Sequence, residues 1–309
     1  MGDAALVDDL GACRAAVERL LGEREVAVDL EGVELGRAPG RICVIQVCAG
    51  DETYIFDITI LQQDAFDAGR LRVLFEDPQV QKVLYDVRSD SDALYHNHGV
   101  RIHNAYDLQV LYQIVFAPKS RHLQSLKRAL GIYAKTAMSA ADLRKLEATK
   151  DAGVRLFAPQ QGGSYAMWEQ RPLPDALIAY CAADVRHLLR MKALWGGPSV
   201  DSAVADVAAR RIADFVAQSV VVQATKSRLD FAVPDLPCAT PEGVEVAEVR
   251  LLAGRVGLVI GRGGATLLRI EAESGAAVSV RDDSVAVLIG TPSEVECAAR
   301  LVRAAMGEA

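Results

Sequence analysis

Two acidic residues in an apolar segment are the first feature of this chain that could do chemistry. Asp29 and Glu31 stand two apart in the segment 25–31, which predicts a β-strand. Residues two apart lie on the same face of a strand. Two adjacent carboxylates repel each other unless a cation lies between them, and hard oxygen ligands favour Mg²⁺ or Mn²⁺. Because such pairs also occur where a strand end reaches solvent, this pair needs support from elsewhere.

A tyrosine and an aspartate four residues apart form a second candidate. Tyr180 and Asp184 belong to the segment 174–193, which predicts a helix. Positions i and i+4 share one face of a helix, so a cation-binding carboxylate would lie beside a phenol that orients a water molecule. An ordinary amphipathic helix produces the same spacing, so this pair is also insufficient alone.

Three aspartates fall within seven residues after a predicted strand. Asp86, Asp90 and Asp92 lie where the strand 80–85 leads into the helix 89–99. Aspartate is favoured just before a helix because its side chain accepts a hydrogen bond from a free backbone amide. One such cap explains one aspartate, so the others predict a further role at this turn.

The order of the predicted elements indicates how these acids could meet. Three strands joined by short turns, at 25–30, 41–48 and 53–57, predict an antiparallel meander. Further strands are expected at 80–85 and 102–107, with helices at 5–22, 89–99, 107–117, 121–130, 140–148 and 174–193. This order predicts an α/β fold of the ribonuclease H-like kind, a mixed sheet with flanking helices. Around the helix at 140–148, the segment 136–170 is expected to be loosely structured, as a lid or a surface loop.

The motifs, taken in order, resemble those of the DEDDy 3′–5′ exonucleases of the RNase D-like kind. Asp-Leu-Glu-Gly at 29–32 and Tyr-x-x-x-Asp at 180–184 match that family, and further similarity lies at 36–46, 106–109, 122–131 and 171–173. The segments 29–37 and 91–100 are most similar to the Egalitarian-like branch. The resemblance covers about residues 15–195 and implies a ribonuclease H-like exonuclease fold.

The resemblance also implies a hydrolytic site with two divalent metal ions, Mg²⁺ or Mn²⁺. By position, it assigns as catalytic residues Asp29, Glu31, Asp90, Tyr180 and Asp184, the four carboxylates being the metal ligands. Asp29 would bridge both ions. Glu31 and Asp184 would hold the ion that binds the attacking water, which Tyr180 would orient. Asp90 would hold the other ion, and Asp92 is the alternative to Asp90 because some Egalitarian-like relatives place the acid there.

A separate module is expected at the C-terminus. The predicted division is an exonuclease domain over 1–198, a helix and linker over 199–241, and a small α+β domain over 242–309. The last segment has the pattern strand, helix, helix, strand, strand, helix and resembles a type I KH domain. Its glycine-rich loop would let the backbone approach nucleic-acid phosphates, through Gly261, Arg262, Gly263 and Gly264.

The composition of this module leaves its ligand open. It has seven arginines, no lysine, ten acidic residues and no Phe, Tyr or Trp, so bases cannot stack on aromatic side chains there. A KH fold used for protein contact is the alternative to nucleic-acid binding. In the N-terminal domain, the basic residues of 117–135 could contact a phosphodiester backbone or form a solvated helix face.

The bulk composition narrows the function further. With 309 residues and a net charge of −7, the chain has no general basic field to attract nucleic acid, so local patches or metal ions must hold a polyanion. Six scattered cysteines without a CxxC pair are typical of reduced thiols in an intracellular protein. The acidic amphipathic N-terminus and the lack of an apolar run of ~18 residues predict neither a signal peptide nor a membrane span. We therefore expect a cytoplasmic protein that is not secreted, with the nucleus or an organelle as alternatives.

Together these patterns predict a 3′–5′ exonuclease whose partner is nucleic acid, RNA before single-stranded DNA. A catalytically inactive RNA-binding adaptor of the Egalitarian-like type is the alternative. Such an adaptor would be expected to lose metal ligands, whereas all five positions are intact here. Protein partners and the oligomeric state stay open.

Overall fold

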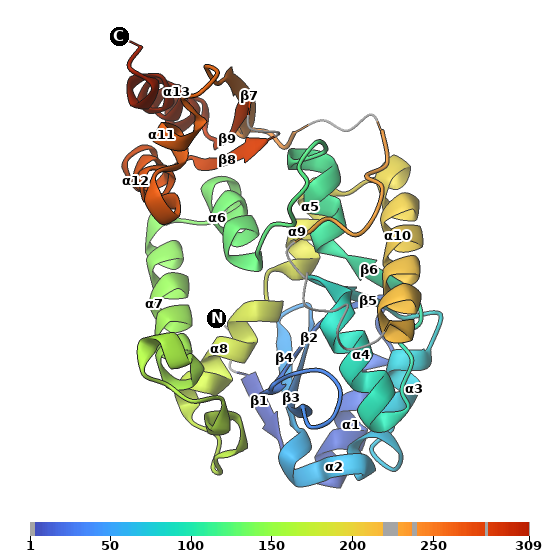
Figure 1. The fold of residues 1–309 in the computed structure, drawn as a ribbon. Helices are drawn as coiled ribbons and strands as arrows, with labels where there is room; N and C mark the ends of the chain where they lie inside the picture. The colour runs from blue at the N-terminus through green and yellow to red at the C-terminus, as the bar shows by residue number, and fades with distance from the viewer. Residues whose placement is uncertain (1–3, 219–227, 237–239, 282–283, 309) are drawn as a thin grey trace. The chain divides into compact units, whose positions relative to one another are not determined.

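The chain forms two compact units in the computed structural model (Figure 1). The structure describes residues 4–218, 228–236, 240–281 and 284–308. One unit comprises Met1–Leu111 and Ala140–Lys226, and the other comprises Tyr112–Ser139 and Ser227–Ala309. The predicted α/β class with a small α+β domain is confirmed. Cys238 and the end of the helix expected after residue 198 lie outside the described residues.

A six-stranded mixed sheet organises the first unit. The strand order is β1-β4-β3-β2-β5-β6, and the strands are β1 (Ala4–Val7), β2 (Glu25–Val33), β3 (Arg41–Ala49), β4 (Glu52–Asp57), β5 (Gln81–Leu84) and β6 (Ala105–Asp107). Strands β2, β3 and β4 form the predicted antiparallel meander, and β5 and β6 add to β2 in parallel. The expectation of a helix from residue 5 is wrong at its start, because Ala4–Val7 pairs in parallel with β4. That partner lies about fifty residues away, where helical periodicity gives no information.

Eight helices of the described residues belong to the first unit. They are α1 (Leu10–Leu20), α2 (Ile58–Phe66), α3 (Leu71–Glu76), α4 (Val87–His98), α7 (Ala140–Phe157), α8 (Asp175–Val185), α9 (Leu188–Trp195) and α10 (Pro198–Ala217). The expectation of a loosely structured segment at 136–170 is wrong over most of its length. Helix α7 continues to Phe157, and two short 3₁₀ turns follow, at Pro159–Gln161 and Tyr165–Glu169.

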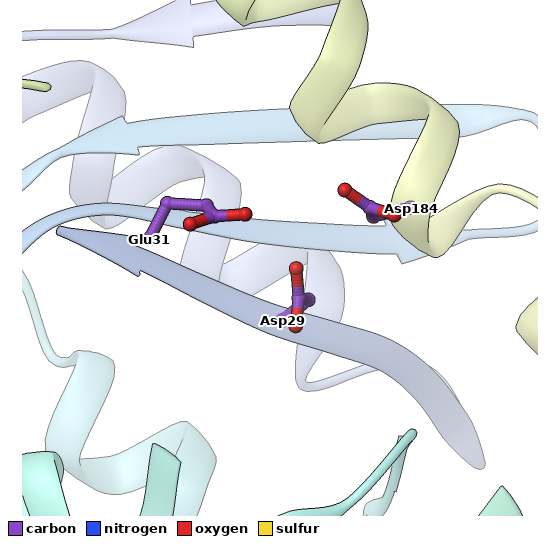
Figure 2. Close-up of side chains that lie close together, drawn as sticks. All are labelled: Asp29, Glu31 and Asp184. Carbon is purple, nitrogen blue, oxygen red and sulfur yellow. The ribbon is translucent and has the colours of Figure 1, made fainter. Parts of the chain in front are cut away.

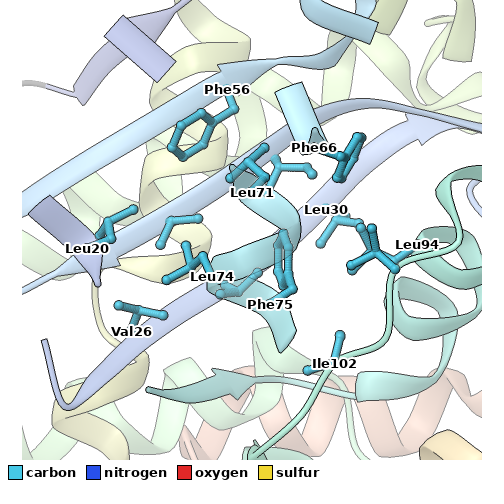
Figure 3. Packing of buried hydrophobic residues seen from close by; sticks show 14 of the residues in the cluster. Leu20, Val26, Leu30, Phe56, Phe66, Leu71, Leu74, Phe75, Leu94 and Ile102 are labelled. Carbon is cyan, nitrogen blue, oxygen red and sulfur yellow. The ribbon is translucent and has the colours of Figure 1, made fainter. Parts of the chain in front are cut away.

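The two faces of the sheet pack differently. One face lies against α1, α2, α3 and α4, where Leu30 of β2 packs among buried side chains such as Phe66 and Phe75 (Figure 3). The opposite face lies against α8, with Leu177 and Cys181 packed on β3 and β4. Because side chains alternate along β2, the residues on either side of Leu30 point towards α8.

The second unit contains the predicted C-terminal module. Its elements are β7 (Glu245–Arg250), α11 (Val256–Ile260), α12 (Ala265–Ser274), β8 (Ala277–Arg281), β9 (Val285–Gly290) and α13 (Pro292–Met306). The three strands pair antiparallel in the order β7-β9-β8, and the strand, helix, helix, strand, strand, helix pattern is confirmed.

Each compact unit combines segments that are distant in the chain. Helix α10 belongs to the first unit, whereas α6 (Leu126–Ala137) belongs to the second. In the second unit Arg128 of α6 forms an ion pair with Glu271 at 2.6 Å and donates to the carbonyl of Val278. Lys135 forms an ion pair with Glu294 at 2.6 Å. These two basic residues therefore hold α6 to the C-terminal module, so they do not form the free solvated face that their sequence allowed.

None of the helices in the described ranges combines the length and the apolar character needed to cross a membrane.

Candidate metal centre

Strand β2 presents its two acids on the face covered by α8. Asp29 lies opposite Gln46 of β3, and the Gln46 side-chain amide donates to Asp29 Oδ2 at 2.6 Å. The pairing of β2 with β3 shifts by a residue between Glu31 and Gly32. A Cβ at position 32 would lie 2.0 Å from the carbonyl oxygen of Arg41, so only glycine fits. This bulge follows Glu31 directly, and bulges of this kind commonly re-aim side chains beside active sites.

Helix α8 adds the third carboxylate. The ligand oxygens of Asp29, Glu31 and Asp184 all lie within 4.8 Å of one another. Figure 2 shows the three side chains converging, two from the strand and one from the helix. Asp184 is buried, and the other two are half-buried. Three of the four predicted carboxylates are thus brought together by a strand face and a helix face.

Burial and mutual repulsion make three charges in this space unfavourable. Burial, followed by the charge of Asp184, raises the pKa of Asp29 to about 7. Burial and the charges of Asp29 and Asp184 raise the pKa of Glu31 well above its ordinary value. Burial also raises the pKa of Asp184, although the charge of Lys150 opposes this shift. A bound cation would remove the cost of ionising these groups.

Two oxygens at this site are ready for a ligand. Asp184 Oδ2 and Gln46 Oε1 are buried without a hydrogen-bond partner. A buried acceptor without a partner costs about 1–3 kcal/mol, so it requires an explanation. Carboxylate oxygens are hard ligands, and no soft sulfur belongs to the group. The donor set therefore fits Mg²⁺ or Mn²⁺.

Lys150 of α7 is a component that the sequence did not identify. Its ammonium group forms an ion pair with Asp184 Oδ1 and lies 3.5 Å from the centroid of the Tyr180 ring. The lysine supplies one positive charge against three carboxylates. No local pattern pointed to this role for Lys150. Its segment was expected to be loosely structured, and its partner Asp184 lies 34 residues further along the chain.

Tyr180 is held by the close approach of α7 to α8. A Cβ on Gly153 would lie 2.6 Å from two carbons of Tyr180, so position 153 must remain glycine for the two helices to pack. The ring of Phe157 meets the Tyr180 ring edge to face at 5.2 Å. Burial and the charge of Asp184 raise the pKa of Tyr180. The phenol therefore stays protonated and can donate a hydrogen bond.

The two alternatives for the fourth carboxylate have different surroundings. Asp92 is buried in α4 and forms an ion pair with Arg37 at 2.9 Å, and His96 lies 3.5 Å from it. Asp90 is also buried in α4, in its first turn. Among the described residues, Asp90 is outside the group whose ligand atoms lie within 4.8 Å. Asp92 is thus held by Arg37, and the assignment of Asp90 as the fourth ligand stays a prediction from the family resemblance.

Two further aspartates at strand ends accept hydrogen bonds from the backbone of the following helix. Asp57 accepts a hydrogen bond from the Ile60 amide at 3.1 Å, at the start of α2, and forms an ion pair with Arg171. Asp107 accepts from the backbone amide of Gln109 at 2.9 Å. Neither belongs to the carboxylate group.

The glycine-rich loop of the C-terminal module is exposed between α11 and α12. Gly261, Gly263 and Gly264 all have positive φ, at 74°, 60° and 82°. A Cβ on Gly261 would lie 2.3 Å from Thr266 Oγ1, whereas Gly263 and Gly264 have open space around them. The side chain of Arg262 is exposed in the same loop. The loop thus offers accessible backbone and one guanidinium group, which suits an anion.

Comparisons with known proteins identify the family of each of the two domains. A family model of 3′–5′ exonucleases matches residues 5–194, and a KH domain model matches residues 241–304. The chain is 28% identical over 183 residues to the piRNA biogenesis protein EXD1 of Mus musculus, a match that covers 58% of this chain and 30% of that protein. It is 27% identical over 186 residues to ribonuclease D of Gluconacetobacter diazotrophicus, with 60% and 40% covered. The chain therefore spans well under half the length of these curated relatives.

Solved structures share the fold. The Trypanosoma brucei RNase D in complex with GMP has a TM-score of 0.57 and 22% identity, and the match covers 77% of this chain and 69% of that one. The same enzyme in complex with RNA has a TM-score of 0.56 and 22% identity, covering 77% and 76%.

Proposed function

Because this chain belongs to the 3′–5′ exonuclease family and carries a C-terminal KH domain, we propose that it is a metal-dependent exonuclease that shortens RNA from its 3′ end. The observation that carries this proposal is the convergence of Asp29, Glu31 and Asp184, with an unpartnered Asp184 oxygen, beside the phenol of Tyr180. A structural ion site would not need a protonated tyrosine at its edge.

We assign each residue a role in phosphodiester hydrolysis. Bound divalent ions would activate a water and neutralise charge at the leaving 3′ oxygen. Asp29, Glu31, Asp184 and Asp90 would hold these ions. Gln46 fixes the Asp29 carboxylate through its amide. Tyr180, protonated because its pKa is raised, would donate a hydrogen bond that orients the water.

When no metal ion is bound, Lys150 would stabilise the arrangement of the side chains in the centre. Its ammonium group neutralises part of the charge of Asp184 and lies against the Tyr180 ring. This contact holds the two catalytic side chains of α8 in place, since both meet the same residue of α7.

RNA is the proposed substrate because two separate features favour it. KH domains present a glycine-rich loop to single-stranded nucleic acid, and this chain exposes such a loop. A structural neighbour was solved as RNase D in complex with RNA. Strand capture by the loop of 261–264 and hydrolysis at the carboxylate centre would then be separate steps.

A degradation assay on the full chain tests this proposal. Single-stranded RNA and DNA of one sequence, labelled at the 5′ end, are incubated with Mn²⁺, Mg²⁺ or EDTA. We expect the labelled RNA to shorten one nucleotide at a time with either metal and to remain intact in EDTA. RNA that binds the protein but never shortens would instead support the adaptor function, and faster loss of DNA would overturn the substrate assignment.

A further inference from the structure

Helix α10 lies outside residues 5–194, which the exonuclease family model matches, yet it is bonded to the turn that leads to Asp90. Arg211 of α10 is buried and forms an ion pair with Asp107. Its guanidinium group also donates to Gln109 Oε1 at 2.9 Å and lies 3.5 Å from Asp86 Oδ1. One arginine thus engages the end of β6 and the residue that precedes α4.

Asp107 connects Arg211 to the backbone at the start of α4. Its Oδ1 accepts from the Asp86 amide at 2.9 Å, and its Oδ2 accepts from the Val87 amide at 3.3 Å. Asp86 has φ 68° and ψ 80°, which is uncommon for a residue other than glycine. Such a conformation persists only where surrounding contacts determine it. The Asp86 side chain is held by Arg88 in turn, at 2.6 and 2.7 Å.

The C-terminal end of α10 holds the next turn of α4. The Arg37 guanidinium donates to the carbonyl oxygens of Phe215 and Val216 at 3.3 and 3.0 Å while it pairs with Asp92. His96 lies 3.2 Å from the Val216 carbonyl oxygen. The contacts of α10 therefore reach α4 on both sides of Asp90.

Arg88 completes the contact between the two helices. It lies just before Asp90 in the chain, and its guanidinium carbon is 5.7 Å from the centroid of the Phe215 ring. Buried charges engaged on all sides are costly to disturb and define one geometry. A helix whose task was only to cover apolar surface would not need a buried arginine at this turn.

We propose that α10 is a positioning element of the metal centre, in which Arg211 and Phe215 fix the turn that orients Asp90 towards the ions. This inference rests on the proposed function, because it requires Asp90 to be a ligand. Arg211 and Phe215 act through Asp107, Asp86 and Arg88, so they are positioning residues. Groups bonded directly to a metal ligand usually change metal affinity about 10- to 100-fold when altered, and we expect a smaller change here because Arg211 and Phe215 act through intermediate residues.

The test uses the full chain and two variants that alter the contacts of α10, called the α10 variants below. Asp107→Asn combined with Arg211→Gln replaces the buried ion pair with a neutral pair that can still form hydrogen bonds. Phe215→Leu removes the ring beside Arg88 and retains most of the apolar volume. Arg210→Gln, at the neighbouring exposed position, is the matched control. Calorimetric titration with Mn²⁺ measures affinity, and thermal unfolding in EDTA measures the fold without ions.

We expect both α10 variants to bind Mn²⁺ up to about tenfold more weakly and to remain folded in EDTA at the temperature of the assay. kcat should fall while KM for RNA stays constant, and excess Mn²⁺ should restore kcat. Rescue by the ion is a result that a merely structural role would not produce. The Arg210→Gln protein should behave like the wild type.

Asp90→Asn separates this inference from the proposed function. If Asp90→Asn leaves Mn²⁺ affinity unchanged, Asp90 is not a ligand, and the proposed metal centre fails together with the inference. If Asp90→Asn weakens Mn²⁺ binding while both α10 variants bind it as tightly as the wild type, the positioning role alone is overturned. Loss of kcat that excess Mn²⁺ does not restore would also overturn it.

Discussion

The candidate metal centre, with cations bound, and the glycine-rich KH loop are both proposed to receive phosphates, but their charged groups are arranged in opposite ways. The centre gathers three carboxylates and a lysine between a strand and two helices, at raised carboxyl pKa values. The loop exposes backbone amides and Arg262 to solvent, with glycines at positive φ. Catalysis requires groups that are fixed in a site shielded from water, whereas capture of a nucleic-acid strand requires an exposed surface.

This difference predicts how each region responds to change. Side chains in the centre have few alternative arrangements, so a substitution that preserves shape but removes one charge should still be severe. The loop has open space around Gly263 and Gly264, so its substitutions should be tolerated by the fold and affect binding alone. The following predictions run from the largest expected effect to the smallest.

Asp29→Asn should abolish hydrolysis and leave the fold intact. The substitution removes the ligand proposed to bridge both ions but keeps the size of the side chain and an oxygen for the Gln46 amide. Activity on labelled RNA in Mn²⁺ and circular dichroism are the measurements. A folded Asp29→Asn protein that shortens RNA at the wild-type rate would rule out the two-metal site.

Tyr180→Phe should slow hydrolysis by about 10²- to 10⁴-fold, the usual contribution of one positioned proton-handling group. The ring contacts with Phe157 and Lys150 remain, so the fold should not change. Single-turnover rates at saturating protein separate this effect from binding. A rate within threefold of the wild type would show that the hydroxyl does not orient the water.

Arg262→Asp combined with Gly263→Asp should weaken RNA capture several-fold and spare the chemistry. Two carboxylates would stand where phosphates are expected, and aspartate is among the residues that accept the positive φ of position 263. KM for long single strands should rise, while kcat on very short substrates stays constant. Both are measured at low salt, where phosphate contacts contribute most.

A matched control for the loop exists on α13. Arg303→Asp combined with Ala304→Asp changes the net charge equally, at exposed positions away from the loop. Equal weakening in both double variants would indicate a general charge effect, and unchanged RNA affinity in the loop variant would favour the protein-contact role of the KH domain.

The carboxylate centre should make the stability of the fold without metal ions decrease as pH rises, which is the smallest of the expected effects. The folded pKa of Asp29 is raised to about 7 from an ordinary value of 3.8. Its protonation therefore stabilises the fold fully below pH 3.8, and this contribution is lost as pH rises through 7. In EDTA, the wild type should unfold a few degrees below Asp29→Asn at pH 8, and the gap should narrow to about half by pH 5.5, because the contribution is complete only below pH 3.8. Mn²⁺ at pH 8 should reverse the order, and a gap that is constant from pH 5.5 to 8 would contradict the shift.

Regular elements with local signals were predictable. The strands of the meander and the whole KH pattern follow from alternation and turn residues, and the structure confirms them. Strand periodicity also placed Asp29 and Glu31 on one face, whereas the addition of Asp184 was expected from the family resemblance and depends on the packing of α8 on the sheet. The predictions were wrong where a strand pairs with a segment that is distant in the chain, as Ala4–Val7 does with β4. They were also wrong where a helix lacks a clear apolar stripe, as in the second half of α7.

The amino-acid sequence by itself determined the type of chemistry, since the acids, the tyrosine and the glycine-rich loop stand at spacings that local geometry converts into sites. Tertiary structure alone decided which charges meet these sites. Lys150 reaches Asp184, Arg37 engages Asp92, and Arg211 engages Asp107, each across at least 34 residues of chain. The physical reason is that ion pairing depends on distance in space, and no periodicity along the chain encodes which arginine or lysine will be buried beside which carboxylate.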